Sequence, residues 1–269
     1  MNQIDLTVVN QENIKTPLIS VVTVSFNCVK NIEKTICSVI NQTYKNIEYI
    51  IIDGGSTDGT LDIIKKYDRY ISYWKSGPDK GIYDAMNKAI KIANGQWISF
   101  MNCGDLFYNE NVLSEVFNSD TSEFDVIYGS VQKNWGDGKK LIVYPDEVKS
   151  VEMPFCHQSS FVKTQYMKEF LFDTHYKVVA DRNFFIQINK KYGKKWLYKN
   201  ITIAEIDCAD SFSIHNEVLA YKESCEIMDI KGIRYFYGLF KIIFRGFLSN
   251  AFPHLVILRR KIRIFMQGR

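Results

Sequence analysis

Acidic, amide and basic side chains stand directly after apolar runs at several places in this sequence. Asp53 follows one run, Asp79 and Lys80 follow another, and Asn102 and Asp105 follow a third. Carboxylates, amides and a lysine are the groups that bind a phosphorylated ligand together with a divalent cation. The residue types therefore predict a ligand site, provided that the fold brings these segments together.

The segment Asp53-Gly-Gly-Ser-Thr-Asp-Gly-Thr60 leaves an apolar run and enters a helical pattern. Its Ser, Thr and second Asp are typical of a turn and of a helix N-cap. Asp53 itself stands at the end of a strand, where its carboxylate can accept hydrogen bonds from a base or ribose. The chain has neither the glycine pattern of a dinucleotide site nor that of a phosphate-binding P-loop. Both absences argue against those two classes of nucleotide protein.

The pattern Asn102-x-Gly104-Asp105 is the candidate metal site. Asp105 would supply one anionic ligand to Mn²⁺ or Mg²⁺, with waters and phosphate oxygens completing the coordination shell. The simpler interpretation is an acidic loop that turns at Gly104. Lys80 is a candidate phosphate or sugar contact, and Asp84 follows it on the first turn of a helix. That pair could equally be a solvated helix start.

Asp181 begins an amphipathic helical pattern and could be either an N-cap or an acid–base group. His157 and Gln158 lie between aromatic and small residues, where a histidine is often structural and sometimes functional. The local pattern alone does not decide between a structural and a functional role for any of these three residues.

The periodicity of the N-terminal part of the chain alternates between strand and helix. Strands are predicted over 18–26, 46–53, 71–75 and 97–101, and helices over 29–42, 60–67 and 82–93. Near-continuous apolar strands separated by helices predict a mostly parallel α/β sheet that is covered on both faces. Ligands bind such sheets at the carboxyl ends of the strands, where Ser25-Phe26-Asn27 and the acidic segments above all stand.

After Phe107 the pattern changes to mixed or antiparallel structure. Strands are predicted over 124–131, 140–144, 158–162 and 196–206, with a turn at Trp135–Gly138 and a helix over 181–191. This half is expected to complete the sheet.

Composition indicates a folded protein of the cytoplasm. The chain has 269 residues, of which 46% are hydrophobic and 24% are charged. These are the proportions of an ordinary globular protein. Its six cysteines form no Cys-x-x-Cys pair, so we expect reduced thiols and neither a disulfide framework nor a zinc site. The N-terminal segment 1–15 is mostly polar, which argues against a signal peptide.

The C-terminal segment is strongly basic and amphipathic. The segment 230–269 contains nine Lys or Arg and no acid, so with a net charge of +4 for the whole chain the segment 1–229 carries −5. On a helical wheel, Lys231, Arg234, Lys241 and Arg245 fall opposite Phe236, Leu239, Phe240, Ile243 and Phe247. The pattern predicts an interfacial helix on an anionic membrane. A solvated core-packing helix is the alternative, and nucleic acid is a less favoured partner.

Together these motifs resemble the family 2 glycosyltransferases of GT-A fold, particularly the branch that builds bacterial exopolysaccharides such as colanic acid. The resemblance runs from about Leu18 to Ser213. It is carried by five segments in the expected order: Asp53–Thr60, Pro78-Asp-Lys-Gly-Ile-Tyr-Asp-Ala-Met-Asn87, Asn102–Asp105, His157-Gln158 and Ala180-Asp181.

The resemblance implies roles for individual residues. Phe26 would stack on the base, Asp53 would hold base and ribose, and Asp105 would bind the metal. Asp181 would remove the proton of the acceptor hydroxyl. The remaining predicted contacts are Asn27, Asp79, Lys80, Asp84 and Asn102 for the nucleotide-sugar, and His157 and Gln158 for the acceptor.

Three positions depart from the family pattern. Gly54 replaces the second base-binding acid, Asn102 replaces an acid of the metal motif, and Cys208–Ser211 replaces a loop that contains two glycines. The first departure weakens the expected contact with the base. The second leaves a single anionic metal ligand.

The resemblance also implies a domain organisation and a function. A polar arm (1–17) precedes a GT-A domain (18–215) with a nucleotide-sugar half (18–107) and an acceptor half (108–215), and a membrane-associating tail (216–269) follows. The implied activity is inverting transfer of a hexose or N-acetylhexosamine from a UDP-sugar to a glycan or lipid-linked glycan at the inner face of the cytoplasmic membrane. The alternatives are a sugar-phosphate nucleotidyltransferase and an inactive nucleotide-sugar-binding subunit of a synthase complex.

Overall fold

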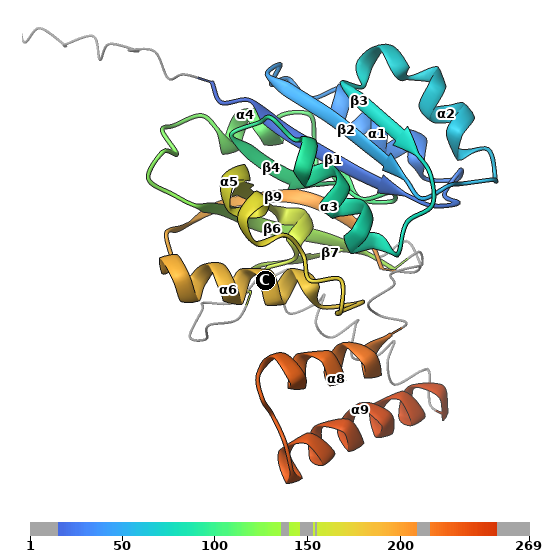
Figure 1. Ribbon diagram of the computed structural model, residues 1–269, viewed down its shortest axis with the longest axis vertical. Helices are drawn as coiled ribbons and strands as arrows, with labels where there is room; N and C mark the ends of the chain where they lie inside the picture. Colours follow the sequence, from blue (N-terminus) through green and yellow to red (C-terminus); the bar gives the residue numbers. More distant parts are fainter. Residues whose placement is uncertain (1–15, 136–139, 146–152, 154, 209–215, 252–269) are drawn as a thin grey trace, which may run out of the picture.

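The computed structural model in Figure 1 describes residues 16–135, 140–145, 153, 155–208 and 216–251. Its centre is one nine-stranded sheet in the order β3-β2-β1-β4-β8-β6-β9-β5, with β7 paired to β6. The strands are β1 (Ile19–Ser25), β2 (Ile47–Asp53), β3 (Tyr73–Ser76), β4 (Trp97–Phe100), β5 (Leu106–Phe107), β6 (Val126–Asn134), β7 (Lys140–Val143), β8 (Ser160–Lys163) and β9 (Trp196–Asp207).

The sheet is parallel in its first half and mixed in its second, as the sequence predicted. β3, β2, β1 and β4 run parallel to one another. β8 is antiparallel to both β4 and β6, whereas β6 and β9 are parallel. β8 begins later than predicted, at Ser160, because His157–Ser159 forms a short 3₁₀ helix, η2.

Helices cover both faces of the sheet because the buried strands present apolar side chains to each side. On β1, Val21 joins one core cluster with Ile36, and Val22 joins a second cluster with Met86. Ile36 and Met86 are both fully buried. Truncating either of them to Ala would cost about 2–5 kcal/mol. The helices are α1 (Ile32–Ile40), α2 (Thr60–Lys66), α3 (Ile82–Ile92), α4 (Val112–Val116), α5 (Thr164–Phe170), α6 (Ala180–Tyr192), α8 (Glu217–Ile227) and α9 (Ile233–Ala251), and the 3₁₀ helix η1 spans Asp68–Tyr70.

The carboxyl ends of the parallel strands meet at one edge of the sheet. Ser25 of β1 pairs with Asp53 of β2, which pairs in turn with Ser76 of β3. The loop after β4 joins the same edge, since the Cys103 amide donates to the Val24 carbonyl. The predicted ligand-binding segments of the first half are therefore neighbours.

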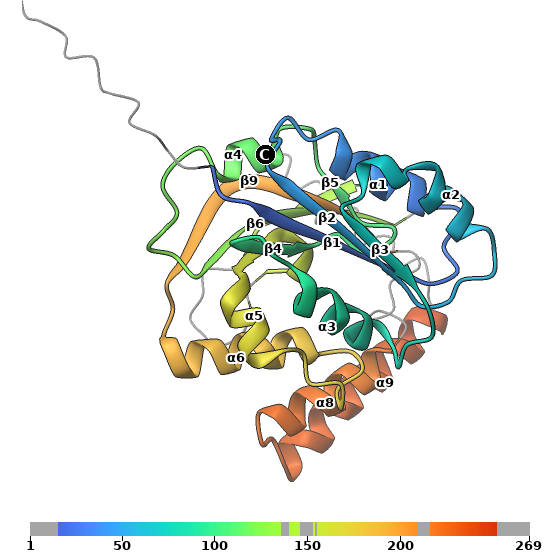
Figure 2. The same ribbon diagram turned by 45° about the horizontal axis from the view of Figure 1, so that its top comes forward.

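Helices α8 and α9 form a hairpin that lies outside the sheet layers, beyond α6 (Figures 1 and 2). The Tyr221 hydroxyl of α8 donates to the Tyr235 carbonyl of α9 at 3.2 Å. Within the part of the chain that the structure describes, no helix is long and apolar enough to cross a bilayer.

Several predicted features lie outside the described residues. They are most of the N-terminal arm, Gly136–Gly138 of the predicted turn, Ala209–Ser211, the side chains of Arg245 and Phe247, and the basic residues Arg259, Arg260, Lys261, Arg263 and Arg269.

Candidate active site

Asp53 lies beneath the loop that follows β2, and it is fully buried. One carboxylate oxygen accepts hydrogen bonds from the Ser25 and Ser56 hydroxyls, at 2.9 and 2.5 Å. The other accepts from the amides of Gly55 and Ser56 and from the Ser76 hydroxyl, at 3.0, 2.8 and 2.7 Å. Burial alone would raise the pKa of Asp53, but these hydrogen bonds outweigh it and lower the pKa.

Five donors occupy the lone pairs of one carboxylate, so Asp53 orders the loop in this arrangement. A direct contact between Asp53 and a nucleotide base stays a prediction, and it would require some of these bonds to be exchanged. Asn27 has a similar role from the β1 side. Its Oδ1 accepts from the Thr57 amide at 2.9 Å, and its own amide donates to Ser56 Oγ at 2.8 Å.

A cavity of about 490 Å³ opens beside these loops, lined by Phe26, Asp79, Lys80, Tyr83, Asn102 and Lys177 among others. Phe26 is 63% exposed. Its ring is therefore available to stack on a planar ligand. A Cβ placed on Gly54 would lie 2.7 Å from Asp79 Oδ2 and 3.2 Å from Phe26 Cδ2. The Asp79 carboxylate thus lies where a side chain at position 54 would have to begin.

The Asp84 side chain is bonded at the start of α3, whereas the Lys80 side chain is exposed. Asp84 accepts the Lys80 amide at 3.1 Å and pairs with Lys88 at 3.1 Å, and these contacts lower its pKa, the Lys80 amide most. This geometry matches the helix-start interpretation of Asp84, and its contact with a nucleotide-sugar stays a prediction. The Lys80 side chain is exposed at the cavity rim and can reach a ligand there.

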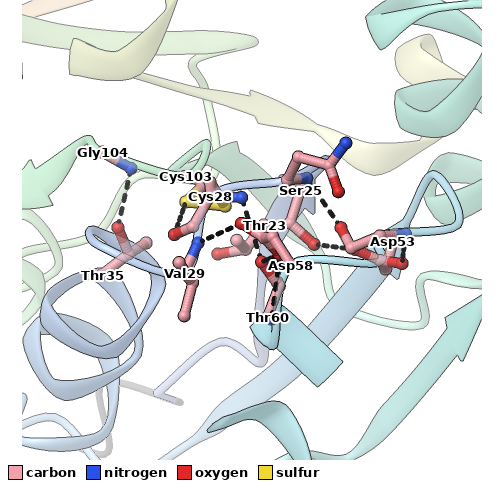
Figure 3. The surroundings of a disulfide bond; sticks show 12 residues. Thr23, Ser25, Cys28, Val29, Thr35, Asp53, Asp58, Thr60, Cys103 and Gly104 are labelled. Atoms are coloured by element: carbon pink, nitrogen blue, oxygen red, sulfur yellow. Dashed lines mark hydrogen bonds between the residues drawn. A yellow bond between two sulfur atoms is a disulfide. The ribbon is translucent and has the colours of Figure 1, made fainter. Parts of the chain in front are cut away.

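The prediction of six reduced thiols is wrong for two residues. Cys28 and Cys103 form a disulfide between the loops after β1 and β4, beside the hydrogen bonds of Asp58 and Thr60 (Figure 3). The two cysteines are 75 residues apart, but β1 and β4 are adjacent parallel strands whose following loops lie at the same edge of the sheet. The remaining Cys37, Cys156, Cys208 and Cys225 are free thiols.

Asp105 closes a tight turn after β4. Its amide donates to the Asn102 carbonyl at 2.8 Å, and the turn requires a positive φ of 100° at Gly104. Glycine adopts such a conformation without strain. The Asp105 side chain is buried, and Gln158 Nε2 donates to its Oδ2 at 3.1 Å. Burial raises the pKa of Asp105 to about 6.

The Asn102–Asp105 turn fits a divalent cation. Asn102 Oδ1 is buried and makes no hydrogen bond, so an oxygen ligand stands unused close to the Asp105 turn. The described residues contain no cluster of three or more His, Cys, Asp or Glu that could hold a metal. A cation here would be bound by Asp105 and the Asn102 oxygen and would need phosphate and water oxygens to complete its shell.

Asp181 stands in the first turn of α6, where the helix dipole favours a carboxylate. Its Oδ2 accepts from His157 Nδ1 at 2.9 Å, and its Oδ1 accepts from the Arg182 amide at 2.8 Å. Burial disfavours its ionised form, but the hydrogen bond and charge of His157 outweigh burial and lower the pKa of Asp181. The carboxylate is therefore ionised and able to accept a proton.

His157 connects Asp181 to the Asn102–Asp105 turn. With its proton on Nδ1, the ring donates to Asp181 and leaves Nε2 as an acceptor. Asn102 Nδ2 donates to that Nε2 at 3.3 Å. Burial works against the charged ring, but Asp181 and the charge of Asp105 outweigh burial and raise the pKa of His157. His157 and Gln158 were predicted to bind the acceptor. The structure places both side chains on the two acids, and acceptor contact stays a prediction.

Tyr83 belongs to the site although the sequence did not single it out. Its hydroxyl lies 2.8 Å from the Val178 carbonyl and 3.2 Å from Asp181 Oδ1. The residue is buried on the inner face of α3, where an aromatic side chain is common in a helical pattern. Its role arises from the packing of α3 near the start of α6, and the local sequence carries no sign of it.

Comparison with known proteins gives relatives of one functional class. A glycosyltransferase of Mycobacterium tuberculosis H37Rv whose activity is uncharacterised, Rv1514c, is 31% identical over 185 residues, covering 64% of this chain and 68% of the relative. The Escherichia coli UDP-Glc:alpha-D-GlcNAc-diphosphoundecaprenol beta-1,3-glucosyltransferase WfaP is 37% identical over 114 residues, which are 42% of this chain and 45% of WfaP. The exopolysaccharide branch itself stays a prediction.

Two solved structures confirm the predicted GT-A fold. Staphylococcus aureus TarS 1-349 in complex with UDP-GlcNAc has a TM-score of 0.60 at 19% identity, over 72% of this chain and 59% of that one. The mannosyltransferase PcManGT of Pyrobaculum calidifontis, in complex with GDP-Man and Mn²⁺, has a TM-score of 0.60 at 14% identity, over 83% of this chain and 68% of that one. At such identities the likeness shows the fold alone.

The family assignment rests on a broader match. The family model described as Glycosyl transferase family 2 matches residues 20–209, which include every site residue discussed above. That match extends over more than half of the sequence, and the chain belongs to glycosyltransferase family 2.

Proposed function

We propose that the protein transfers a hexose or N-acetylhexosamine, with inversion, from a UDP-sugar to a glycan or lipid-linked glycan in the synthesis of bacterial surface polysaccharide. The observation that carries the proposal is the ionised Asp181 carboxylate, paired with His157 and connected through Asn102 to the Asp105 turn. WfaP, whose name gives a UDP-glucose donor and a lipid-linked acceptor, supports the substrate class.

The chemistry follows from a carboxylate beside a nucleotide-binding cavity. Asp181 accepts the proton of the acceptor hydroxyl while that oxygen forms a bond to the anomeric carbon. The bond from the anomeric carbon to the diphosphate oxygen breaks on the opposite face, and the nucleoside diphosphate leaves with its electron pair. His157 holds Asp181 Oδ2, and Tyr83 and the Arg182 amide hold Oδ1. The base is therefore positioned before the acceptor arrives.

The donor site is assigned to the cavity of about 490 Å³. Phe26 stacks on the base, Asp79 accepts hydrogen bonds from base or ribose, and Lys80 contacts the diphosphate. Asp105 and the Asn102 oxygen would hold a Mn²⁺ or Mg²⁺ ion, which would stabilise the negative charge of the leaving diphosphate. PcManGT, which carries Mn²⁺ on a similar fold, supports this part of the proposal.

The α9 helix supplies an attachment surface for the membrane that holds a lipid-linked acceptor. Its exposed apolar residues recur at helical spacing, beginning with Ile233, which is 86% exposed, and continuing through Phe236, Tyr237, Phe240, Ile243 and Phe244. Lys241 flanks this stripe and lies 4.7 Å from the Tyr237 ring. Exposed aromatics with flanking cations suit an anionic lipid interface, and we place the enzyme on the inner face of the cytoplasmic membrane.

Replacing Asp181 by Asn tests the activity. Turnover, measured as release of nucleoside diphosphate with donor and acceptor present, should fall by on the order of 10² or more because the base is lost. Donor affinity by calorimetry should be unchanged, since Asp181 faces the acceptor. The matched control is Asp120→Asn, which changes an exposed acid in a turn closed by Ser122. Equal losses of turnover and donor affinity in Asp181→Asn would contradict the assignment of Asp181 as the general base.

A further inference from the structure

Glu223 is an acid of α8 that lies buried in the body of the protein. It is 7% exposed, although α8 belongs to the hairpin outside the sheet. One carboxylate oxygen accepts the Lys177 amide at 2.7 Å. The other accepts the amides of Val178 and Val179, at 2.9 and 3.2 Å. A single side chain therefore satisfies three consecutive backbone amides.

Such an arrangement fixes the backbone that it binds. A buried carboxylate is costly unless hydrogen bonds compensate its charge, and amide donors to a charged acceptor form strong bonds. Three amides in a row can face one carboxylate only if the segment 177–179 keeps a single curved conformation. A contact between α6 and α8 adds to this, since Arg182 Nη1 donates to Ser224 Oγ at 3.0 Å.

The segment that Glu223 holds leads directly into the catalytic helix. Val178 is bound from both sides, because its amide donates to Glu223 and its carbonyl lies 2.8 Å from the Tyr83 hydroxyl. Asp181 follows shortly after the last held amide, and its Oδ1 lies 3.2 Å from the same Tyr83 hydroxyl. Lys177 also lines the donor cavity. The position of Asp181 thus depends on a segment pinned between α3 and α8.

We propose that Glu223 is a positioning residue for the transfer reaction, which fixes residues 177–179 and thereby the carboxylate of Asp181. On this proposal α8 works with the active site, and the membrane-attaching part of the tail begins after it, with α9. The sequence placed the start of the tail at residue 216, ahead of α8. The proposal rests on the proposed function in one respect, namely that Asp181 is the base.

The test compares full-length Glu223→Gln and Glu223→Ala with the wild type and with Lys222→Gln, which changes the exposed neighbour of Glu223 on α8. Hydrogen exchange at the amides of Lys177, Val178 and Val179 should quicken by on the order of 10-fold or more when the charged acceptor is lost. Turnover on a soluble acceptor without lipid should fall by on the order of 10²-fold, the scale of a catalytic group displaced by about 1 Å. Donor affinity should fall by less than turnover, since of the three held residues only Lys177 lines the donor cavity.

The pattern across variants separates positioning from general instability. Glu223→Gln keeps one carbonyl oxygen, so its turnover should lie between those of the wild type and Glu223→Ala, while Lys222→Gln should match the wild type. If Glu223→Ala does not fold, the comparison of Glu223→Gln with the wild type is by itself the test of the proposal. Unchanged exchange at 177–179, or faster exchange with full turnover, overturns the proposal. Full turnover of Asp181→Asn would instead overturn the proposed function, and the exchange result would still show whether Glu223 holds the segment.

Discussion

Two buried acids of the site, Asp105 and Asp181, have pKa values shifted in opposite directions. Burial dominates at Asp105 and raises its pKa to about 6, whereas His157 and two further donors lower the pKa of Asp181. The difference follows from their partners, since Asp105 accepts from the neutral Gln158 amide and Asp181 accepts directly from an imidazole. Asp105 is thus an acid that a cation would stabilise, and Asp181 is already a stable anion.

Replacing Asp105 by Asn should remove the metal-dependent part of nucleotide binding. Asparagine keeps the size of the side chain and an oxygen for Gln158 Nε2, but it lacks the charge that attracts a cation. In a thermal-shift experiment the wild type should gain stability with UDP and Mn²⁺ together, because both bind the folded state. Asp105→Asn should lose most of the Mn²⁺-dependent gain, while Asp120→Asn keeps it. A full Mn²⁺-dependent gain in Asp105→Asn would contradict the metal assignment.

The His157–Asp181 pair should make stability depend on pH. The folded-state pKa of His157 is raised. Its contribution is therefore complete below the unfolded value of about 6.5 and is lost as pH rises through the folded pKa. The pKa of Asp181 is lowered. Its contribution is therefore present above the unfolded value of about 3.9 and is lost as pH falls through its folded pKa. The pair therefore stabilises the folded protein most at pH values between the unfolded pKa of Asp181 and the unfolded pKa of His157.

Urea unfolding at pH 6 and pH 9 tests this on the wild type and His157→Gln. The variant should lose more free energy of unfolding at pH 6 than at pH 9, by on the order of 1.5–3 kcal/mol, the contribution of a hydrogen bond to a charged group. Protonation of Nε2 also requires the Asn102 amide to turn its oxygen toward the ring. An equal loss at both pH values would show that the ring is neutral in the fold.

At the scale of elements, most of the helices and strands that hydrophobic periodicity can indicate were predicted from the sequence. The apolar run of β2 and the helical spacing of α3 placed both elements close to their observed bounds, Ile47–Asp53 and Ile82–Ile92. Because parallel strands align their carboxyl ends, the order of strands and helices was enough to bring Asp53 and Asp105 to one edge. Element type, sheet class and the nearness of the candidate site segments all follow from local pattern together with this rule.

Contacts made by tertiary packing could not be predicted in the same way. Asp53 could be placed at a strand end, but its five donors come from the ends of β1 and β3 and from the loop after β2, which only the folded sheet brings together. Cys28 and Cys103 carry no spacing signal because their nearness depends on β1 pairing with β4. Glu223 is one acid in an ordinary helical pattern, and its burial depends on where α8 meets residues 177–179.

At the scale of the whole molecule, the α8–α9 hairpin has one side toward the body and one toward solvent. Glu223 attaches α8 to the segment before α6, and Tyr221 of α8 contacts α9 near Gly238, where an added Cβ would lie 1.9 Å from the Tyr221 hydroxyl. The exposed aromatics of α9 thus lie on a helix that packs closely on an anchored neighbour. A membrane contact made by that stripe would hold the catalytic domain at the lipid surface.

Replacing Phe236 and Phe240 together by Glu should release the protein from anionic vesicles without weakening nucleotide binding. Each exposed phenylalanine would gain about 1.5–3 kcal/mol on burial in lipid, so losing both should reduce partitioning by on the order of 10² or more. Sedimentation with anionic vesicles should bring down the wild type at low salt and less of it at high salt, because charges are screened beyond about 8 Å at physiological ionic strength.

Tyr70→Glu is the matched control, because it places a charge on an exposed aromatic in η1, distant in sequence from the hairpin. Turnover on a lipid-linked acceptor should fall in the Phe236/Phe240 variant far more than turnover on a short soluble analogue, since only the first acceptor has to be reached at the bilayer. Truncation after Ile230 should give the same result, because it keeps α8 and with it the contact of Glu223 to residues 177–179. If the wild type stays in the supernatant with anionic vesicles at low salt, the exposed stripe of α9 is a surface for protein contact, and the difference between the two acceptors should vanish with it.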